Sequence, residues 1–161
     1  MMHSNRHFQS GVAAVELGLL LIPLITLIFG ISEYGRAMYQ YNTLGKAVRD
    51  GARYLSQYEA GDATAIAKAR CLVAYGNTAC TDAPLLPQLT SSTMNTMIIV
   101  KDSKNDPSMS LQPMIANGVS VGVTNLVKLT VKGYEFTSLV SFVVPSFAFD
   151  PISVTMTQAL P

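Results

Sequence analysis

Few residues of this chain could carry out chemistry by themselves. The two histidines, His3 and His7, both precede Gly11, and the two cysteines, Cys71 and Cys80, are too few for a thiolate metal cage. The carboxylates are scattered, and no pair of them stands at helical spacing on an apolar face. A serine–lysine pair stays chemically open, but nothing in the sequence marks one. We therefore expect neither an enzyme nor a metal site, and no cofactor.

One acid stands inside a long apolar run near the N-terminus. Val12–Ser32 is apolar apart from Glu16 and a few small polar residues. Its length matches the stretch of about 20 residues that a helix needs to cross a hydrocarbon core. A charge deep in a bilayer costs roughly 2.5–3.5 kcal/mol on insertion scales. Glu16 therefore either lies near the headgroups at the positive end of its own helix or has a partner.

The residues around that acid resemble a known processing site. Gly11 is followed by VAAVEL, which places the acid fifth after the glycine, as in type IV prepilins. The longer pattern GVAAVELGLLLIPLITLIFGISEYGRAMYQYNTLGKAVRDGARYLSQ is similar to the TadE-like family of pseudopilins from tight-adherence (Tad/Flp) pilus systems. Leu17 departs from the family, which often has an aromatic residue there. The matching motif positions are Glu33, Gly35, Arg36, Ala47, Arg49, Ala52 and Arg53.

The resemblance implies a function, a processing step and a set of partners. A prepilin peptidase would cut between Gly11 and Val12, and Glu16 would act in assembly. The partners would be the membrane, other pilins or pseudopilins, and the inner-membrane pilus assembly platform. The implied function is that of a minor pseudopilin for a tight-adherence type IV pilus, used in adhesion, biofilm formation or secretion. The alternative is a membrane-anchored periplasmic binding module unrelated to pilus assembly, and an anchored enzyme is the third hypothesis.

Composition excludes one large class of partner. Charged residues make up 13% of the chain, the net charge is +1 and tryptophan is absent, so nucleic-acid binding has no electrostatic footprint.

A secretory signal peptide is a poor match for the N-terminal region, because the apolar run is too long and no small-residue cleavage site follows it. We expect the run to be retained as a membrane helix.

The charges that flank the span conflict with the resemblance. Lysine and arginine normally collect on the cytoplasmic side of a membrane helix. Here Arg6 precedes the span, whereas Arg36, Lys46, Arg49 and Arg53 follow it. Simple counting would place the C-terminal side in the cytoplasm. The processing-site resemblance and the cysteine pair argue for the opposite orientation. We expect a single-pass protein of the bacterial inner membrane with an extracytoplasmic, periplasmic C-terminal domain.

Helical periodicity continues past the membrane span. We expect a leader at 1–11, a transmembrane helix at 12–32, a helical continuation at 33–60 and an α+β domain at 61–161. An apolar stripe on the continuation packs either against the domain's own sheet or against neighbouring subunits. The stripe consists of Tyr34, Met38, Tyr41, Gly45, Val48, Ala52 and Leu55. A second helix is predicted over Ala65–Tyr75, capped by Asp62 or Thr64 and ended by Gly76-Asn77.

The second half of the chain alternates with period two, which indicates strands. Strands are expected at Met97–Val100, at residues 119–123 and 127–133, and at Ile152–Gln158. Residues 124–126 are either a turn between two strands or a bulge in one. Asp102–Asn117 is expected to be a loop, and Tyr134–Phe149 a long loop or short helix. The fold class is then α+β and pilin-like, with a long N-terminal helix on a small antiparallel sheet.

Cys71 and Cys80 flank the end of the predicted second helix. An even pair of cysteines in an oxidising compartment favours a disulfide. Two unpaired thiols are the alternative. A disulfide here would also support the extracytoplasmic location of the C-terminal domain.

Overall fold

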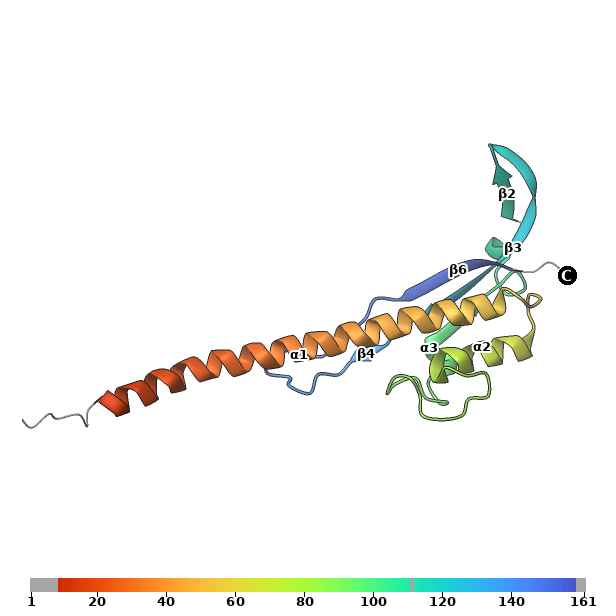
Figure 1. Ribbon diagram of the computed structural model, residues 1–161. Helices are drawn as coiled ribbons and strands as arrows, with labels where there is room; N and C mark the ends of the chain where they lie inside the picture. The colour runs from red at the N-terminus through yellow and green to blue at the C-terminus, as the bar shows by residue number, and fades with distance from the viewer. Residues whose placement is uncertain (1–8, 111, 159–161) are drawn as a thin grey trace, which may run out of the picture. The chain divides into compact units, whose positions relative to one another are not determined.

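The computed structural model describes residues 9–110 and 112–158, and the chain divides into two compact units (Figure 1). The first unit combines the chain up to Met38 with Thr137–Ser146. The second combines Tyr39–Phe136 with Phe147–Pro161. Most of the expected leader, including His3 and His7, lies outside the described residues.

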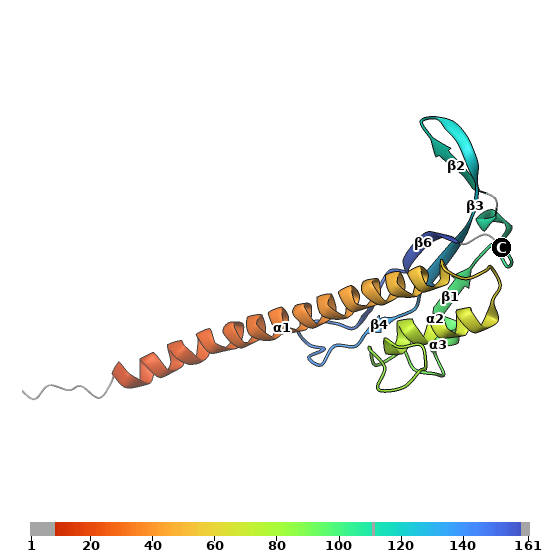
Figure 2. The ribbon, with the colours of Figure 1, turned by 45° about the vertical axis from the view of Figure 1, so that its right-hand side comes forward.

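A single helix, α1, runs over Gln9–Leu55 and continues through Pro23 (Figures 1 and 2). Arg53 lies in its last turn, where a cation complements the partial negative charge of the helix end. The helix stops before the Ala60 boundary expected from the sequence. Past Leu55 the chain forms tight turns, in which the amides of Gln57 and Tyr58 donate to the carbonyls of Tyr54 and Leu55.

The second helix, α2, covers Ala63–Tyr75, and its predicted caps are confirmed. The Asp62 carboxylate accepts hydrogen bonds from the amides of Thr64 and Ala65. Gly76 adopts a left-handed conformation with φ of 74°, which ends the helix at little steric cost. The short helix α3, Met94–Met97, leads directly into the first strand.

The main sheet has four antiparallel strands built around one long strand, β3, at Val119–Val131. The second half of β3 pairs with β1 (Ile98–Lys101) on one side and with β6 (Ile152–Gln158) on the other. Its first half pairs with β2 (Gln112–Ala116). The α+β class expected from the sequence is therefore confirmed, as is the last strand.

Two details of the sheet differ from the expectation. Part of the expected loop at Asp102–Asn117 forms β2 and a short 3-10 helix, η1, at Pro107–Met109. Asn117 and Gly118 connect β2 to β3 with φ of 50° and 78°, the conformation of a two-residue hairpin turn. Residues 124–126 form no turn, because β3 continues through them where its partner changes from β2 to β6.

A second, two-stranded sheet closes part of the expected loop at Tyr134–Phe149. In it, β4 (Glu135–Phe136) pairs with β5 (Phe147–Ala148). The Gln88 side chain extends this pairing, since its amide nitrogen donates to the Glu135 carbonyl and its oxygen accepts from the Glu135 amide. The rings of Tyr134, Phe136 and Phe149 pack together beside it.

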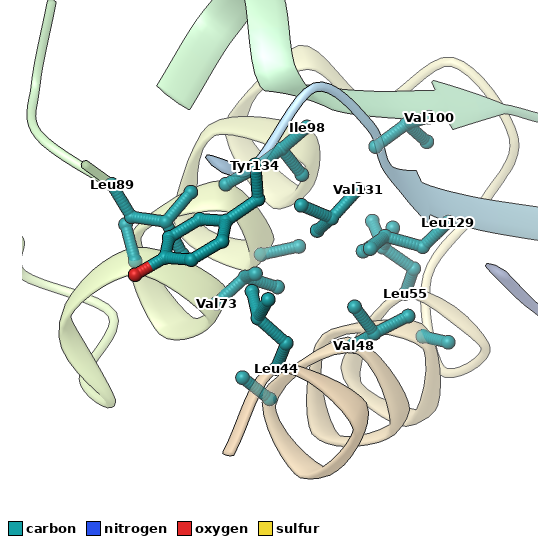
Figure 3. Close-up of a cluster of buried hydrophobic side chains, with 14 of the residues drawn as sticks. Leu44, Val48, Leu55, Val73, Leu89, Ile98, Val100, Leu129, Val131 and Tyr134 are labelled. Carbon is teal, nitrogen blue, oxygen red and sulfur yellow. The ribbon is translucent and has the colours of Figure 1, made fainter. Parts of the chain in front are cut away.

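The core of the second unit lies between α1, α2 and the main sheet (Figure 3). Val48 and Leu55 of α1 face Leu129 of β3 and Val73 of α2. Full burial of each such side chain contributes about 1.5–3 kcal/mol. The predicted stripe is thus confirmed as core at Val48, Ala52 and Leu55, which are at most 2% exposed. Its first half, Tyr34, Met38 and Tyr41, stays 42–67% exposed.

Polar side chains organise the loops at the far end of the sheet from β4. Buried Asp102 accepts hydrogen bonds from the amides of Gly61, Lys104 and Asn105. Asp106 accepts from Lys101, at 2.8 Å, and from Ser108. The Lys101 hydrogen bond is the main reason that the pKa of Asp106 falls to about 2, and the Ser108 hydrogen bonds add to it.

Candidate functional site

The apolar part of α1 is the feature of the first unit that needs a partner. Its large side chains are exposed, with Leu17, Leu20 and Ile22 between 65% and 68%. By length and composition, α1 is the one helix among the described residues that could cross a membrane. Such a surface is unfavourable in water and suits a hydrocarbon environment. Tyr34 and Tyr39, each 67% exposed, have the ring type that collects at membrane interfaces.

Gly11, Val12 and Glu16 all lie in the first turns of this helix. Among the described residues, no atom outside the adjoining backbone lies within 4 Å of a Cβ built on Gly11, so no packing contact in this part of the chain explains the glycine. Val12 is 61% exposed, and Glu16 is exposed as well. Along an α-helix, Val12 and Glu16 are separated by about one turn, or roughly 6 Å. A new N-terminus at Val12 would therefore lie close to the carboxylate of its own chain.

Glu33 and Arg36 form the most organised polar cluster of the first unit. The Glu33 carboxylate accepts from Arg36 Nη2 at 2.9 Å and from the Leu139 amide at 3.3 Å. Arg36 Nη2 also donates to the Thr137 carbonyl at 2.6 Å. The Glu33 side chain is only 5% exposed and that of Arg36 is 31% exposed. These contacts, named here the Glu33 clasp, fasten the loop Thr137–Ser146 to α1.

The other motif residues do not join the clasp. Arg49 and Arg53 are exposed on α1, and Arg49 Nε donates to the Gly45 carbonyl at 3.0 Å. Gly35 is exposed, with open space around the position of a Cβ. Ala47 and Ala52 are buried in the core of the second unit. The motif thus has a polar half, the clasp, and a half whose alanines pack inward while its arginines face solvent.

The predicted disulfide is present. Cys71 on α2 is bonded to Cys80, and their Cα atoms are 4.8 Å apart. The Asn77 side chain shapes the intervening loop, since its oxygen accepts from the amides of Ala79 and Thr81 at 3.1 Å. Cys80 itself has φ of 54°. The bond therefore joins the end of α2 to a loop with its own hydrogen-bond network.

No group of three or more histidine, cysteine, aspartate or glutamate side chains in the described part of the chain could hold a metal ion. A hollow of about 570 Å³ is lined by residues 57–62 and Lys104. The pKa of nearby Tyr54 is raised, first by its hydrogen bond with Tyr58 and then by desolvation. A raised pKa keeps the Tyr54 phenol protonated at neutral pH.

Sequence reasoning missed two residues of the clasp, Thr137 and Leu139. Their contribution is made by backbone atoms, which leave no side-chain signature. The available signal is compositional, because residues 137–146 contain no charged side chain and five large apolar ones. An uncharged apolar segment late in a chain with a membrane helix is a reason to look for contact with that helix.

Comparison with known proteins adds one match. Residues 11–53 match a protein-family model described as "TadE-like protein". No curated protein matches, and no solved structure matches. The matched residues include Gly11, Glu16 and the Glu33–Arg36 pair, and they end two residues before α1 does.

Proposed function

We propose that the chain, whose residues 11–53 match the TadE-like family model, is a minor pseudopilin for assembly of a tight-adherence type IV pilus. The family implies a pilus-associated, structural role. We place the protein in the bacterial inner membrane by one pass, with residues 61–161 in the periplasm. Its partners are then a prepilin peptidase, other pilins or pseudopilins and the assembly platform. The pilus would be used in adhesion, biofilm formation or secretion.

One observation carries this proposal above the alternative of a plain anchored binding module. The exposed apolar stretch of α1, Val12–Ser32, holds a single acid, Glu16, about one turn from Val12. A plain anchor requires neither a glycine before the span nor an acid within it, and the acid raises the cost of insertion. A subunit that is cut after Gly11 and then assembled through its new amine makes use of both.

Processing imposes a requirement on the start of α1. The Gly11–Val12 bond lies within the helix, which begins at Gln9. A peptidase that binds its substrate in extended form must first unwind this turn. Glycine lowers the cost of unwinding, because a glycine in a helix interior is about 1 kcal/mol less favourable than an alanine. It also leaves room beside the cut, where a larger side chain would collide with the peptidase.

The test is the mature N-terminus of protein purified from its native membranes. We expect it to begin at Val12, with a methylated amine. Gly11→Val should keep the leader and still insert into the membrane. Gly18→Val is the matched control, because Gly18 also lies on exposed α1 with open space around it. Retention of the leader in the wild-type protein, or normal cleavage of Gly11→Val, would contradict the proposal.

A further inference from the structure

We propose that the loop Thr137–Ser146 is a second membrane-contacting element, which inserts Leu139 and Phe142 into the bilayer at the C-terminal end of the span. The inference rests on the membrane anchoring in the proposed function and does not depend on pilus assembly. The occupant of this surface is lipid. A second copy of the chain is the competing occupant, and the experiment below distinguishes the two.

Exposure and composition mark the loop as a membrane-seeking segment. Phe142 is 82% exposed and Leu139 is 77% exposed, more than any other large hydrophobic residue described as exposed in this structure. Residues 137–146 read TSLVSFVVPS and carry no charge. Apolar side chains presented on an uncharged loop cost free energy in water and gain it at the boundary between headgroups and acyl chains.

Contacts within the first unit place this loop at the end of the apolar span. A Cβ built on Gly30 would lie 3.6 Å from Val143 Cγ1, inside the expected 12–32 span. One turn later, Glu33 holds the Leu139 amide and Arg36 holds the Thr137 carbonyl. Figures 1 and 2 both show the loop running beside α1. If α1 crosses the membrane at 12–32, the loop lies at the bilayer surface.

Five amides of the loop donate hydrogen bonds within the first unit, which suits a poorly hydrated environment. Unsatisfied amides are costly in lipid, so non-helical segments there must satisfy their donors internally. The amides of Ser138, Leu139 and Val140 donate to Ser146 Oγ, Glu33 and Ser138 Oγ. Those of Val143 and Val144 both donate to the Val140 carbonyl. Pro145 has no amide to satisfy.

The neighbouring charges suit the same environment. Glu33 is buried and paired with Arg36 at 2.9 Å, so neither end of the clasp brings an isolated charge to the interface.

The area of the exposed surface distinguishes lipid from a protein partner. The two exposed side chains, Leu139 and Phe142, offer far less than the roughly 800 Å² per partner that a stable protein interface buries. Continuity with the membrane helix and the small area together favour lipid over another protein.

The absence of tryptophan from the chain allows a direct test. Phe142→Trp and Leu139→Trp each introduce a single tryptophan at an exposed position, where the fold does not depend on the side chain. The full-length protein is reconstituted into phosphatidylethanolamine–phosphatidylglycerol vesicles. Emission and quenching by lipids brominated at different depths are then measured. Leu20→Trp in the middle of the span and Tyr58→Trp in the second unit are the matched references.

We expect blue-shifted emission at positions 142 and 139, quenched most by bromines near the headgroups. Leu20→Trp should be quenched most by bromines near the chain ends, and Tyr58→Trp should not be quenched. Emission typical of water at position 142 would overturn the inference. Blue-shifted emission that no brominated lipid quenches would overturn it in favour of a protein occupant. An unquenched Leu20→Trp would overturn the anchoring itself, and with it this inference, whereas a failure of pilus assembly alone would leave both standing.

Discussion

The Glu33 carboxylate accepts a hydrogen bond at 3.3 Å from the amide of Leu139, a residue 106 positions later in the chain. The same oxygen accepts from Arg36 at 2.9 Å, so one carboxylate joins two motif residues of α1 to a distant loop. Glu33 is 4% exposed, which makes the loss of either partner costly. Within one chain, Glu33 and Arg36 therefore hold the loop Thr137–Ser146 against α1.

Removal of the Glu33 carboxylate should release the loop. Glu33→Ala deletes the acceptor of the Leu139 amide and leaves Arg36 without its paired charge. The loss of a hydrogen bond to a charged group is worth about 1.5–3 kcal/mol. We expect exchange of the Leu139 amide with solvent deuterium to accelerate by roughly 10- to 150-fold, since each 1.4 kcal/mol is tenfold.

Two comparisons make the clasp experiment specific. Glu33→Gln keeps an acceptor for the Leu139 amide but removes the charge, so its effect should be smaller. Asp50→Ala removes an exposed carboxylate elsewhere on α1 and should leave exchange at Leu139 unchanged. Equal protection of Leu139 in the wild-type protein and Glu33→Ala would show that the loop is held by its apolar contacts instead.

The Cys71–Cys80 bond should be both a stabilising link and a marker of compartment. In the chain-entropy description, closing a loop this short stabilises the fold by roughly 2.5–3 kcal/mol. The double variant Cys71→Ser/Cys80→Ser should lower the free energy of unfolding by about that amount. Reduction of the wild-type protein should reproduce the loss, and the variant should not respond to reductant.

The state of the same bond in cells reports on topology. Disulfides form and persist in oxidising compartments such as the periplasm. Protein trapped with a thiol-blocking reagent directly from cells should therefore have the mass of the oxidised form, lower by two hydrogens. Quantitative labelling of both thiols in that sample would contradict the periplasmic placement of residues 61–161.

Gly51 is required where α1 approaches α2 and β3. A Cβ added there would lie 2.6 Å from Val73 Cγ2 and 3.0 Å from Leu129 Cδ1, and Val73 is fully buried. Overpacking of this kind costs typically about 1–3 kcal/mol. That exceeds the gain of about 1 kcal/mol from replacing a helical glycine. Gly51→Ala should therefore destabilise the second unit by up to about 2 kcal/mol in thermal or denaturant unfolding.

Gly45, two turns earlier on the same helix, is the matched control. Its nearest contact for an added Cβ is Arg49 Nη2 at 3.9 Å, which is ordinary contact. Gly45→Ala should leave stability unchanged or raise it by up to about 1 kcal/mol. Adding Val73→Ala to Gly51→Ala should recover part of the loss, because the two side chains compete for one space. Equal effects at both glycines would mean that the core relaxes around position 51.

Much of the fold could be predicted from local patterns. The caps at Asp62 and Gly76 and the alternation in Ile152–Gln158 are local signals, and both elements were predicted correctly. β2 was missed because Pro113 and the polar residues before it outweighed Asn117-Gly118, a strong hairpin signal flanked by apolar residues. The end of α1 at Leu55 was missed because no glycine or proline marks it.

The candidate site was less predictable, for a physical reason. The sequence identified Glu33 and Arg36 as motif residues, but not what they hold. Their partners are the backbone atoms of Thr137 and Leu139, about a hundred residues away. A contact to the backbone does not constrain the side chain at the partner position. No pattern of residue types therefore predicts such a contact. The exposed N-terminal part of α1 raises the opposite problem, because the sequence implies a partner that lies outside the chain.

The last prediction concerns Glu16 and assembly. After a cut at Gly11, Val12 carries a free amine, and Glu16 lies about one helical turn away on an exposed apolar surface. In a filament, the amine of an incoming subunit and the Glu16 carboxylate of a neighbour can meet in a poorly hydrated layer. There the charge pair offsets part of the desolvation that each charge suffers alone, and it fixes the axial register of the two helices.

Substitutions at Glu16 should therefore separate processing from assembly. Glu16→Ala should leave cleavage and membrane insertion intact, and insertion should become easier because a charge is removed from the span. The number of pili per cell and the recovery of the subunit with assembly partners should both fall. Glu16→Gln preserves shape and hydrogen bonding while it removes the charge, so a defect equal to that of Glu16→Ala would assign the effect to charge. Normal piliation in both strains would show that the acid only favours the positive end of its own helix, and the register argument would fail.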